Sequence, residues 1–107
     1  MTYNYIMFNA STVIHFTLNK GYLKWSTYDL GAISMSLMLA EKDRGVDSIQ
    51  AAYVVVFHDI LRKVLKIPDN EDIIIGIAFG YEEICKANDY RAPKLKVDDV
   101  CKFIDEA

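Results

Sequence analysis

The strongest constraint on the fold is a ten-residue run, Asp72–Tyr81, with the sequence DIIIGIAFGY. Side chains alternate between the two sides of a strand, so this run predicts two unlike faces. The bulky face carries Ile73, Ile75, Ile77 and Phe79. The other face carries Ile74, Gly76, Ala78 and Gly80. Because a mostly small face lets another element approach closely, we expect a buried strand here.

A loop with two spaced cations follows this strand. The segment Asn88–Lys94 reads NDYRAPK and presents Arg91 and Lys94. Guanidinium and ammonium groups are common partners of phosphates and carboxylates. The combination predicts a ligand site at the end of a buried strand, although it does not name the ligand. An ordinary solvated loop is the alternative.

Length and charge limit the class of protein. A chain of 107 residues suits a single domain, and a composition of 52% hydrophobic and 25% charged residues should fold. A net charge of −3 argues against a nucleic-acid binder, which usually shows a basic face. The sequence has no signal-peptide pattern and no run of roughly 18 apolar residues that would span a membrane. We therefore expect a cytoplasmic protein without membrane contact.

The chemistry-bearing residues outside the cationic loop are few. Two cysteines, Cys85 and Cys101, could form a redox or metal pair, but no CxxC or histidine-rich spacing supports this. We expect two unrelated thiols and no metal site. His15 lies in a predicted strand, Thr12–Leu18, which the turn Asn19–Gly21 closes. Catalysis by His15 is conceivable, but a single histidine without a nearby acid or nucleophile favours a structural role.

The longest predicted helix runs from Tyr28 to about Arg44 and has apolar stripes on two sides. A capping-box pattern precedes it, with Ser26 or Thr27 as the cap, and Gly45 is placed to end it. One stripe holds Leu30, Ile33, Leu37 and Ala40, and the other holds Tyr28, Ala32, Met35 and Leu39. Such a helix must be covered on both sides. We expect a homodimer; the alternative is that the chain's own elements suffice.

The remaining elements are shorter. Val46–Gln50 is a predicted strand, and Ala51–Phe57 is ambiguous between strand and helix. Asp59–Ile67 is a predicted helix that Pro68 stops. An amphipathic helix is expected to close the chain, with an apolar face of Val97, Val100, Cys101 and Ile104. Because helical patterns separate the strands, parallel crossovers are expected.

Three segments in this order resemble a known family: YDLGAISMSLMLAEKDRGVDSIQ, HDILRKVLKIPDNEDIIIGIAFGY and NDYRAPKLKVDDV. From about Asn9 onward the chain resembles the C-terminal half of the FMN-dependent nitroreductase family. The resemblance implies an α+β, nitroreductase-like fold, with a small mixed sheet and a long buried central helix. It also implies a homodimer with FMN bound between the subunits. NAD(P)H would donate the hydride, and a small-molecule acceptor such as a nitroaromatic or a quinone would receive it.

The resemblance also implies a set of cofactor-binding residues. Backbone N–H groups of Gln50, Ala51, Ala52 and Tyr53 would lie near the flavin ring, with Gln50 where the family usually has proline. Arg91 and Lys94 match the family's basic residues that contact the FMN phosphate. No side chain is expected to act as a catalytic acid or base, because the flavin carries the hydride chemistry.

The chain departs from the family in its N-terminal part. The family's Arg-x-Ser-x-Arg motif for the flavin phosphate and its Asn/Gln-rich stretch against the ring have no counterpart in this sequence. We therefore expect a truncated version of the fold. A flavin-dependent oxidoreductase is the first hypothesis. The alternative is a non-catalytic, dimeric module that has lost the flavin. A small adaptor unrelated to flavins is a third possibility, but it gives no role to the NDYRAPK loop.

Overall fold

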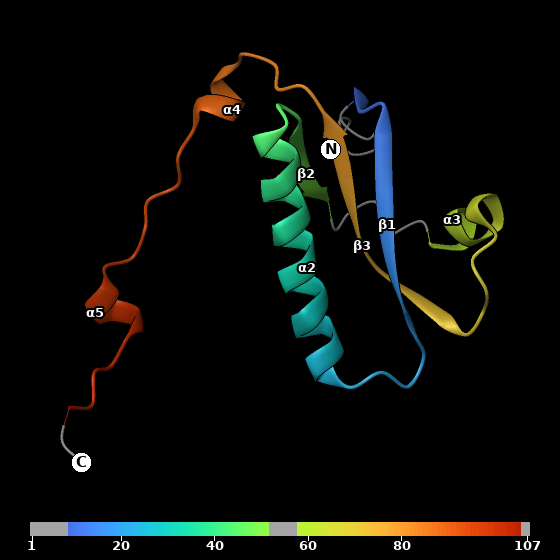
Figure 1. Cartoon of the computed structure of the whole chain (residues 1–107), viewed down its shortest axis with the longest axis horizontal. Coiled ribbons are helices and arrows are strands. Elements are labelled where there is room, and N and C mark those ends of the chain that lie inside the picture. Colours follow the sequence, from blue (N-terminus) through green and yellow to red (C-terminus); the bar gives the residue numbers. More distant parts are fainter. Residues whose placement is uncertain (1–8, 52–57, 106–107) are drawn as a thin grey trace.

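A three-stranded sheet and one long helix form the body of the protein in the computed structural model, which describes residues 9–51 and 58–105 (Figure 1). The strands are β1 (Thr12–Asn19), β2 (Asp47–Ala51) and β3 (Glu71–Gly80). The helices are α2 (Lys24–Asp43), α3 (His58–Leu65), α4 (Lys86–Asp89) and α5 (Val97–Val100). The predicted α+β fold is confirmed, and three predicted strands appear within one or two residues of their expected bounds.

The last strand in sequence is the middle strand of the sheet. The spatial order is β1-β3-β2, and both pairings are antiparallel. The expected parallel crossover is therefore confirmed for β1 and β2, which α2 connects, and wrong for β2 and β3, which α3 connects. Since β1 and β2 both oppose β3, they run in the same direction, and α2 connects them. They do not pair because β3 occupies the place between them.

A bulge in β3 changes which residues share a face. Phe16 pairs with Ile75, whereas Thr17 pairs with Ile73, so Ile74 has no partner in the register. The extra residue brings Ile73 to the side of Thr17, away from Ile75. The Thr17 hydroxyl donates to the Glu71 carboxylate at 3.0 Å on that side. Ile75, Ile77 and Phe79 therefore share one face as predicted, whereas Ile73 does not, because a bulge breaks the two-residue alternation.

The core lies where α2 crosses the bulky face of β3. Ile77 is fully buried, and Phe79 and Leu30 are nearly so. Ser34 of α2 is also buried, and its hydroxyl donates to the Leu30 carbonyl at 2.8 Å. A small residue with a satisfied hydroxyl carries no polar penalty at a buried position. Ser34 thus lets α2 approach the sheet closely at this position.

Both ends of α2 can be explained from local chemistry. The helix begins at Lys24 with Leu23 at the N-cap, one turn before the predicted capping box, which is therefore wrong. Thr27 donates instead to the Lys24 carbonyl at 2.5 Å, inside the first turn. At the other end Gly45 has a φ of 81°, and its N–H reaches the Lys42 carbonyl at 3.0 Å. The predicted stop at Gly45 is confirmed.

The connection through α3 is tied to the start of β3. Lys66, with a φ of 55°, follows the last residue of α3, so the helix ends two residues before the predicted end at Ile67. The guanidinium of Arg62 donates to the Pro68 carbonyl at 2.9 Å and to the Glu71 carbonyl at 2.5 Å. A rigid five-donor group thus holds the α3–β3 turn.

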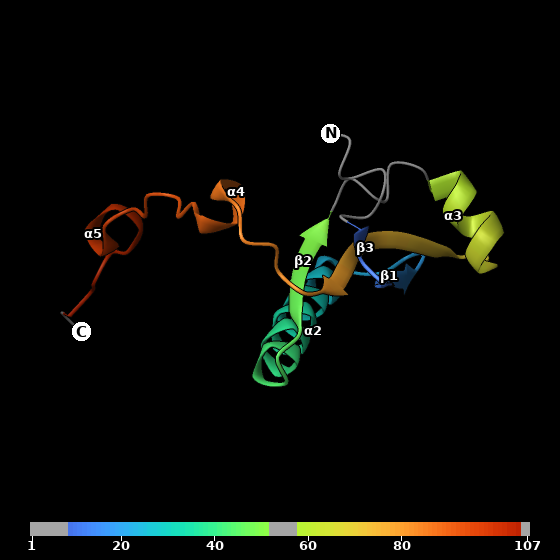
Figure 2. The same ribbon diagram turned by 90° about the horizontal axis from the view of Figure 1, so that it is seen from above.

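Residues 81–105, here called the C-terminal arm, leave the body after β3 (Figures 1 and 2). The predicted closing helix is wrong beyond α5, because Cys101 is extended and Ile104 has no surface to pack against. The radius of gyration is 17.2 Å, against about 13 Å for a compact domain of this length. The arm carries eight exposed apolar side chains: Tyr81, Ile84, Tyr90, Leu95, Val97, Val100, Phe103 and Ile104.

Truncating the central side chain should cost the most stability. Ile77→Ala is expected to lower the free energy of unfolding by about 2–5 kcal/mol, since it leaves a cavity at a fully buried site. Ile60→Ala makes the same chemical change in α3, where the side chain is 62% exposed, and should change it by under about 0.5 kcal/mol. Urea denaturation followed by circular dichroism measures both. If both variants lost the same free energy of unfolding, the placement of Ile77 in the core would be contradicted.

Candidate cofactor-binding site

The predicted site residues lie on two separate elements. Gln50 and Ala51 are the last residues of β2, while Arg91 and Lys94 lie in the C-terminal arm beyond α4. Ala52 and Tyr53 fall outside the described residues. Across the described ranges, no hydrogen bond or ion pair joins the arm to Gln50 or Ala51. A single copy of the chain therefore does not connect the two parts of the predicted site.

The end of β2 can offer only some of its backbone donors. β2 is an edge strand that pairs with β3 alone. In an antiparallel pair, N–H groups point alternately toward the partner and toward the open edge. Of Gln50 and Ala51, one N–H therefore faces β3, and the other points to the open edge, where no described strand accepts it. Their side chains also differ, because Gln50 is exposed whereas Ala51 is buried.

The guanidinium of Arg91 uses only part of its hydrogen-bonding capacity within the described chain. Its Nη1 group donates to the Asn88 carbonyl at 2.7 Å and to the Tyr90 carbonyl at 3.0 Å, both on its own turn. These bonds hold the side chain in place, but the acceptors are neutral. A guanidinium carries five N–H donors, so three remain. No carboxylate pairs with Arg91 in the described part of the chain, and Lys94 is likewise exposed without a described partner.

The point where the arm leaves the sheet is organised by a carboxylate that the sequence did not single out. Asp47 opens β2, and its carboxylate forms an ion pair with Lys42 at the end of α2. Its other oxygen accepts the backbone N–H of Glu82 at 2.8 Å. The hydrogen bond from Lys42, followed by that from Glu82, holds the pKa of Asp47 below its ordinary value. Only the fold reveals this role, because Asp47 and Glu82 are 35 residues apart.

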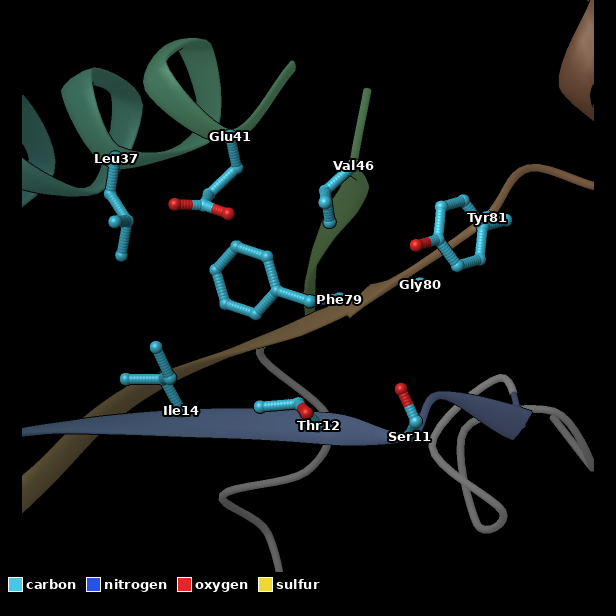
Figure 3. Close-up of a pocket in the computed structure, with 9 residues that line it drawn as sticks. All are labelled: Ser11, Thr12, Ile14, Leu37, Glu41, Val46, Phe79, Gly80 and Tyr81. Atoms are coloured by element: carbon cyan, nitrogen blue, oxygen red, sulfur yellow. The ribbon is translucent and has the colours of Figure 1, made fainter. Parts of the chain in front are cut away.

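A hollow of about 340 Å³ lies between α2 and the end of the sheet (Figure 3). Leu37 and Glu41 project into it from α2, facing the ring of Phe79. Ile14 and Val46 add apolar walls, and Ser11, Thr12 and Tyr81 also line the hollow. None of the predicted site residues lines this hollow, so it is separate from the predicted FMN contacts. Sequence patterns did not indicate it, because its walls come from distant segments.

His15 lies on the opposite side of the sheet. It lines a second hollow, of about 410 Å³, together with Thr17 and Glu71. Its Nε2 atom is buried without a hydrogen-bond partner in the described residues. Burial lowers the pKa of His15, so the ring is neutral at pH 7. The Glu71 carboxylate accepts from Thr17, and no described bond joins it to His15. This environment favours the structural interpretation.

Two further properties concern the same described ranges. No cluster of three or more histidine, cysteine or acidic residues there could hold a metal ion. No described helix is both long enough and apolar enough to cross a membrane.

Comparison with curated proteins gives a consistent result. No family model matches the chain. A 4-nitrobenzoate reductase from Pseudomonas putida is 27% identical over 102 residues, which is 94% of this chain and 45% of the relative. A nitrobenzene nitroreductase from Ectopseudomonas oleovorans is 26% identical over 101 residues, covering 92% and 44%. The chain therefore spans less than half the length of these relatives.

Comparison with solved structures also finds nitroreductases. A mutant of the FMN- and NADPH-dependent nitroreductase NfnB from Sphigopyxis sp. strain HMH superimposes with a TM-score of 0.91 over 98% of this chain and 49% of that one, at 21% identity. The chain resembles the nitroreductases in sequence and has their fold. The FMN-dependent NfnB from Mycobacterium smegmatis was solved in complex with NADPH. It superimposes on this nitroreductase-like chain with a TM-score of 0.88 at 25% identity, and the match covers 96% of this chain and 46% of the NfnB chain.

The burial of His15 has a measurable consequence for this nitroreductase-like chain. The unfolded state takes up a proton near pH 6.5, whereas burial lowers the pKa of His15 in the folded state. The associated stability is therefore fully present above pH 6.5 and is lost as the pH falls toward the lower folded pKa. We expect His15→Leu to flatten the pH dependence of the free energy of unfolding below about pH 6.5, where the wild type loses this stability.

The control for this experiment is Ile60→Ala, which changes an exposed side chain of α3 that does not titrate. It should keep the wild-type pH dependence in urea denaturation curves. An unchanged slope in His15→Leu would show that His15 is not held neutral by the fold.

Proposed function

We propose that this chain takes part in FMN-dependent oxidation of NAD(P)H, with nitroaromatics or quinones as acceptors. The observation that carries the proposal is the match of nearly the whole chain to the fold of FMN-dependent nitroreductases. Four curated relatives support the same chemistry, because each is named for a nitroaromatic substrate: 4-nitrobenzoate in two of them, nitrobenzene and chloronitrobenzene in the others.

The described residues fit part of an FMN molecule. Arg91 has unused donors and no carboxylate partner in the described chain, which is what a phosphate dianion requires. Lys94 lies three residues further along the arm and would add a second positive charge. One open-edge N–H of Gln50 or Ala51 would donate to the flavin ring. Ala52 and Tyr53 belong to this proposal on sequence grounds alone.

In this proposal the cofactor and the protein have different roles. FMN, when bound, supplies hydride transfer between NAD(P)H and the acceptor. The chain supplies binding and orientation, since the arm's cations hold the phosphate and the β2 edge orients the ring. No described side chain is needed as an acid or base, and neutral His15 lies on the sheet face opposite α2.

A homodimer is part of the proposal. The outward stripe of α2 is uncovered in the single copy, with Tyr28, Met35 and Leu39 all more than half exposed. The arm adds further exposed apolar side chains that the body does not cover. A second copy could cover both surfaces and bring its arm toward the β2 edge of the first. That arrangement would join the two parts of the site, which one copy keeps apart.

A non-catalytic dimeric module is the second candidate. It is favoured by the lack of any bond between Arg91 and the β2 edge within the described single copy. Both candidates are assigned to the cytoplasm, because Cys85 and Cys101 are free thiols, which suit a reducing compartment.

The FMN proposal is tested by titrating the purified protein with FMN and following flavin fluorescence. Arg91→Ala should weaken binding about 10- to 100-fold, which corresponds to the loss of a hydrogen bond to a charged group. Lys63→Ala, at an exposed position on α3, removes the same charge away from the arm and should leave affinity unchanged. Equal affinity of wild type and Arg91→Ala would remove Arg91 from the site. A wild-type protein that binds no FMN would favour the module instead.

The dimer proposal is tested by sedimentation equilibrium. Met35→Glu places a charge in the outward stripe of α2, and burying it unpaired costs several kcal/mol. The dissociation constant of the dimer should therefore rise at least about 100-fold. Val64→Glu introduces the same charge on an exposed position of α3 and should leave it unchanged. A wild-type protein that stays monomeric at high concentration would contradict the proposal.

A further inference from the structure

The arm is attached to the body by very few polar contacts. β3 ends at Gly80, which pairs with Asp47 across the sheet. Two residues later the Glu82 N–H donates to the Asp47 carboxylate at 2.8 Å. Beyond Glu82, the described hydrogen bonds of the arm all stay within the arm. The Glu82 bond is therefore the last described polar link between the arm and the body.

Asp47 is itself held from two sides. Its carboxylate accepts from Lys42 on one oxygen and from Glu82 on the other. Asp47 thus connects the end of α2, the start of β2 and the exit of β3. A short side chain with two acceptor oxygens is suited to such a bridge. The lowered pKa of Asp47 means that the carboxylate stays charged at neutral pH.

Hydrogen bonds within the segment from Glu83 to Arg91 connect its two ends. The Asn88 amide donates to the Glu83 carbonyl at 2.7 Å, and the Asp89 N–H reaches the Cys85 carbonyl at 3.1 Å. Arg91 then donates back to the Asn88 carbonyl at 2.7 Å. A turn of the backbone at Glu82 would therefore carry Arg91 with it, so the direction set at Glu82 determines where the guanidinium lies.

We propose that Asp47 is a positioning residue: by holding the Glu82 N–H, it sets the direction in which the C-terminal arm leaves the sheet and so places Arg91. Its link to the cofactor rests on the proposed FMN function, whereas the link to arm direction does not. Asp47 is not placed in contact with the cofactor. Its effect on binding would pass entirely through the backbone of the arm.

Arm direction can be measured by energy transfer from Trp25, the single tryptophan, to a dye on Cys101. Cys85→Ser leaves Cys101 as the one labelling site. Labelled chains are mixed with an excess of unlabelled Trp25→Phe chains, so that transfer is measured within one copy. Time-resolved donor decay then gives the distribution of distances. Asp47→Ala should broaden and shift it, whereas Asp47→Asn, which keeps an acceptor for Glu82, should restore it.

Two further variants complete the set. Asp43→Ala makes the same change at an exposed position on α2 and should leave the distribution unchanged. Glu82→Pro removes the donor and leaves Asp47 intact, so it should reproduce the effect of Asp47→Ala even if that variant fails to fold. Thermal unfolding of each protein shows whether the distance changes occur without a general loss of structure.

FMN titration of the same variants separates the two proposals. Asp47→Ala should weaken FMN binding about tenfold, within the limit set by one hydrogen bond to a charged group, and Asp47→Asn should bind nearly as wild type. If transfer changes as expected but wild type binds no FMN, the flavin function fails and the positioning role stands. Unchanged transfer in both Asp47→Ala and Glu82→Pro would overturn the positioning role.

Discussion

The insertion of β3 between β1 and β2 is the contact on which the rest of the structure depends. It buries Ile77 completely and gives α2 a surface on which Leu30 and Ser34 can pack. It also pairs Gly80 with Asp47, which fixes where the chain leaves the sheet. A middle strand contributed by the second half of the chain makes the body cooperative, because neither early strand has a partner without it.

Local patterns predicted the elements well and their arrangement poorly. The alternation in Asp72–Tyr81, the turn after β1 and the glycine stop at Gly45 are all encoded within a few residues. Antiparallel pairing and the bulge at Ile74 depend on β1, which is more than fifty residues earlier. The capping box at Ser26 misled because Leu23 can end the extended segment one turn sooner, with no side-chain bond needed.

In the candidate site, too, local features could be predicted from sequence and long-range contacts could not. The cations Arg91 and Lys94 can be identified from sequence because they are close together in a short loop. The role of Asp47 cannot, since its partners Lys42 and Glu82 lie on opposite sides of it in the chain and meet only in the fold. Nor could sequence alone show that just one N–H of Gln50 and Ala51 points away from the described sheet, which follows from the edge position of β2.

The uncovered apolar surface of α2 and the arm also bears on how the protein is made. Chains with exposed side chains such as Trp25, Leu39 and Phe103 attract one another without specificity until these side chains are covered, as they would be in the proposed dimer. Rapid assembly then competes with aggregation, and the yield of folded material depends on synthesis rate and temperature. For the proposed dimer, resistance to heat would increase with protein concentration, because mass action favours the associated state.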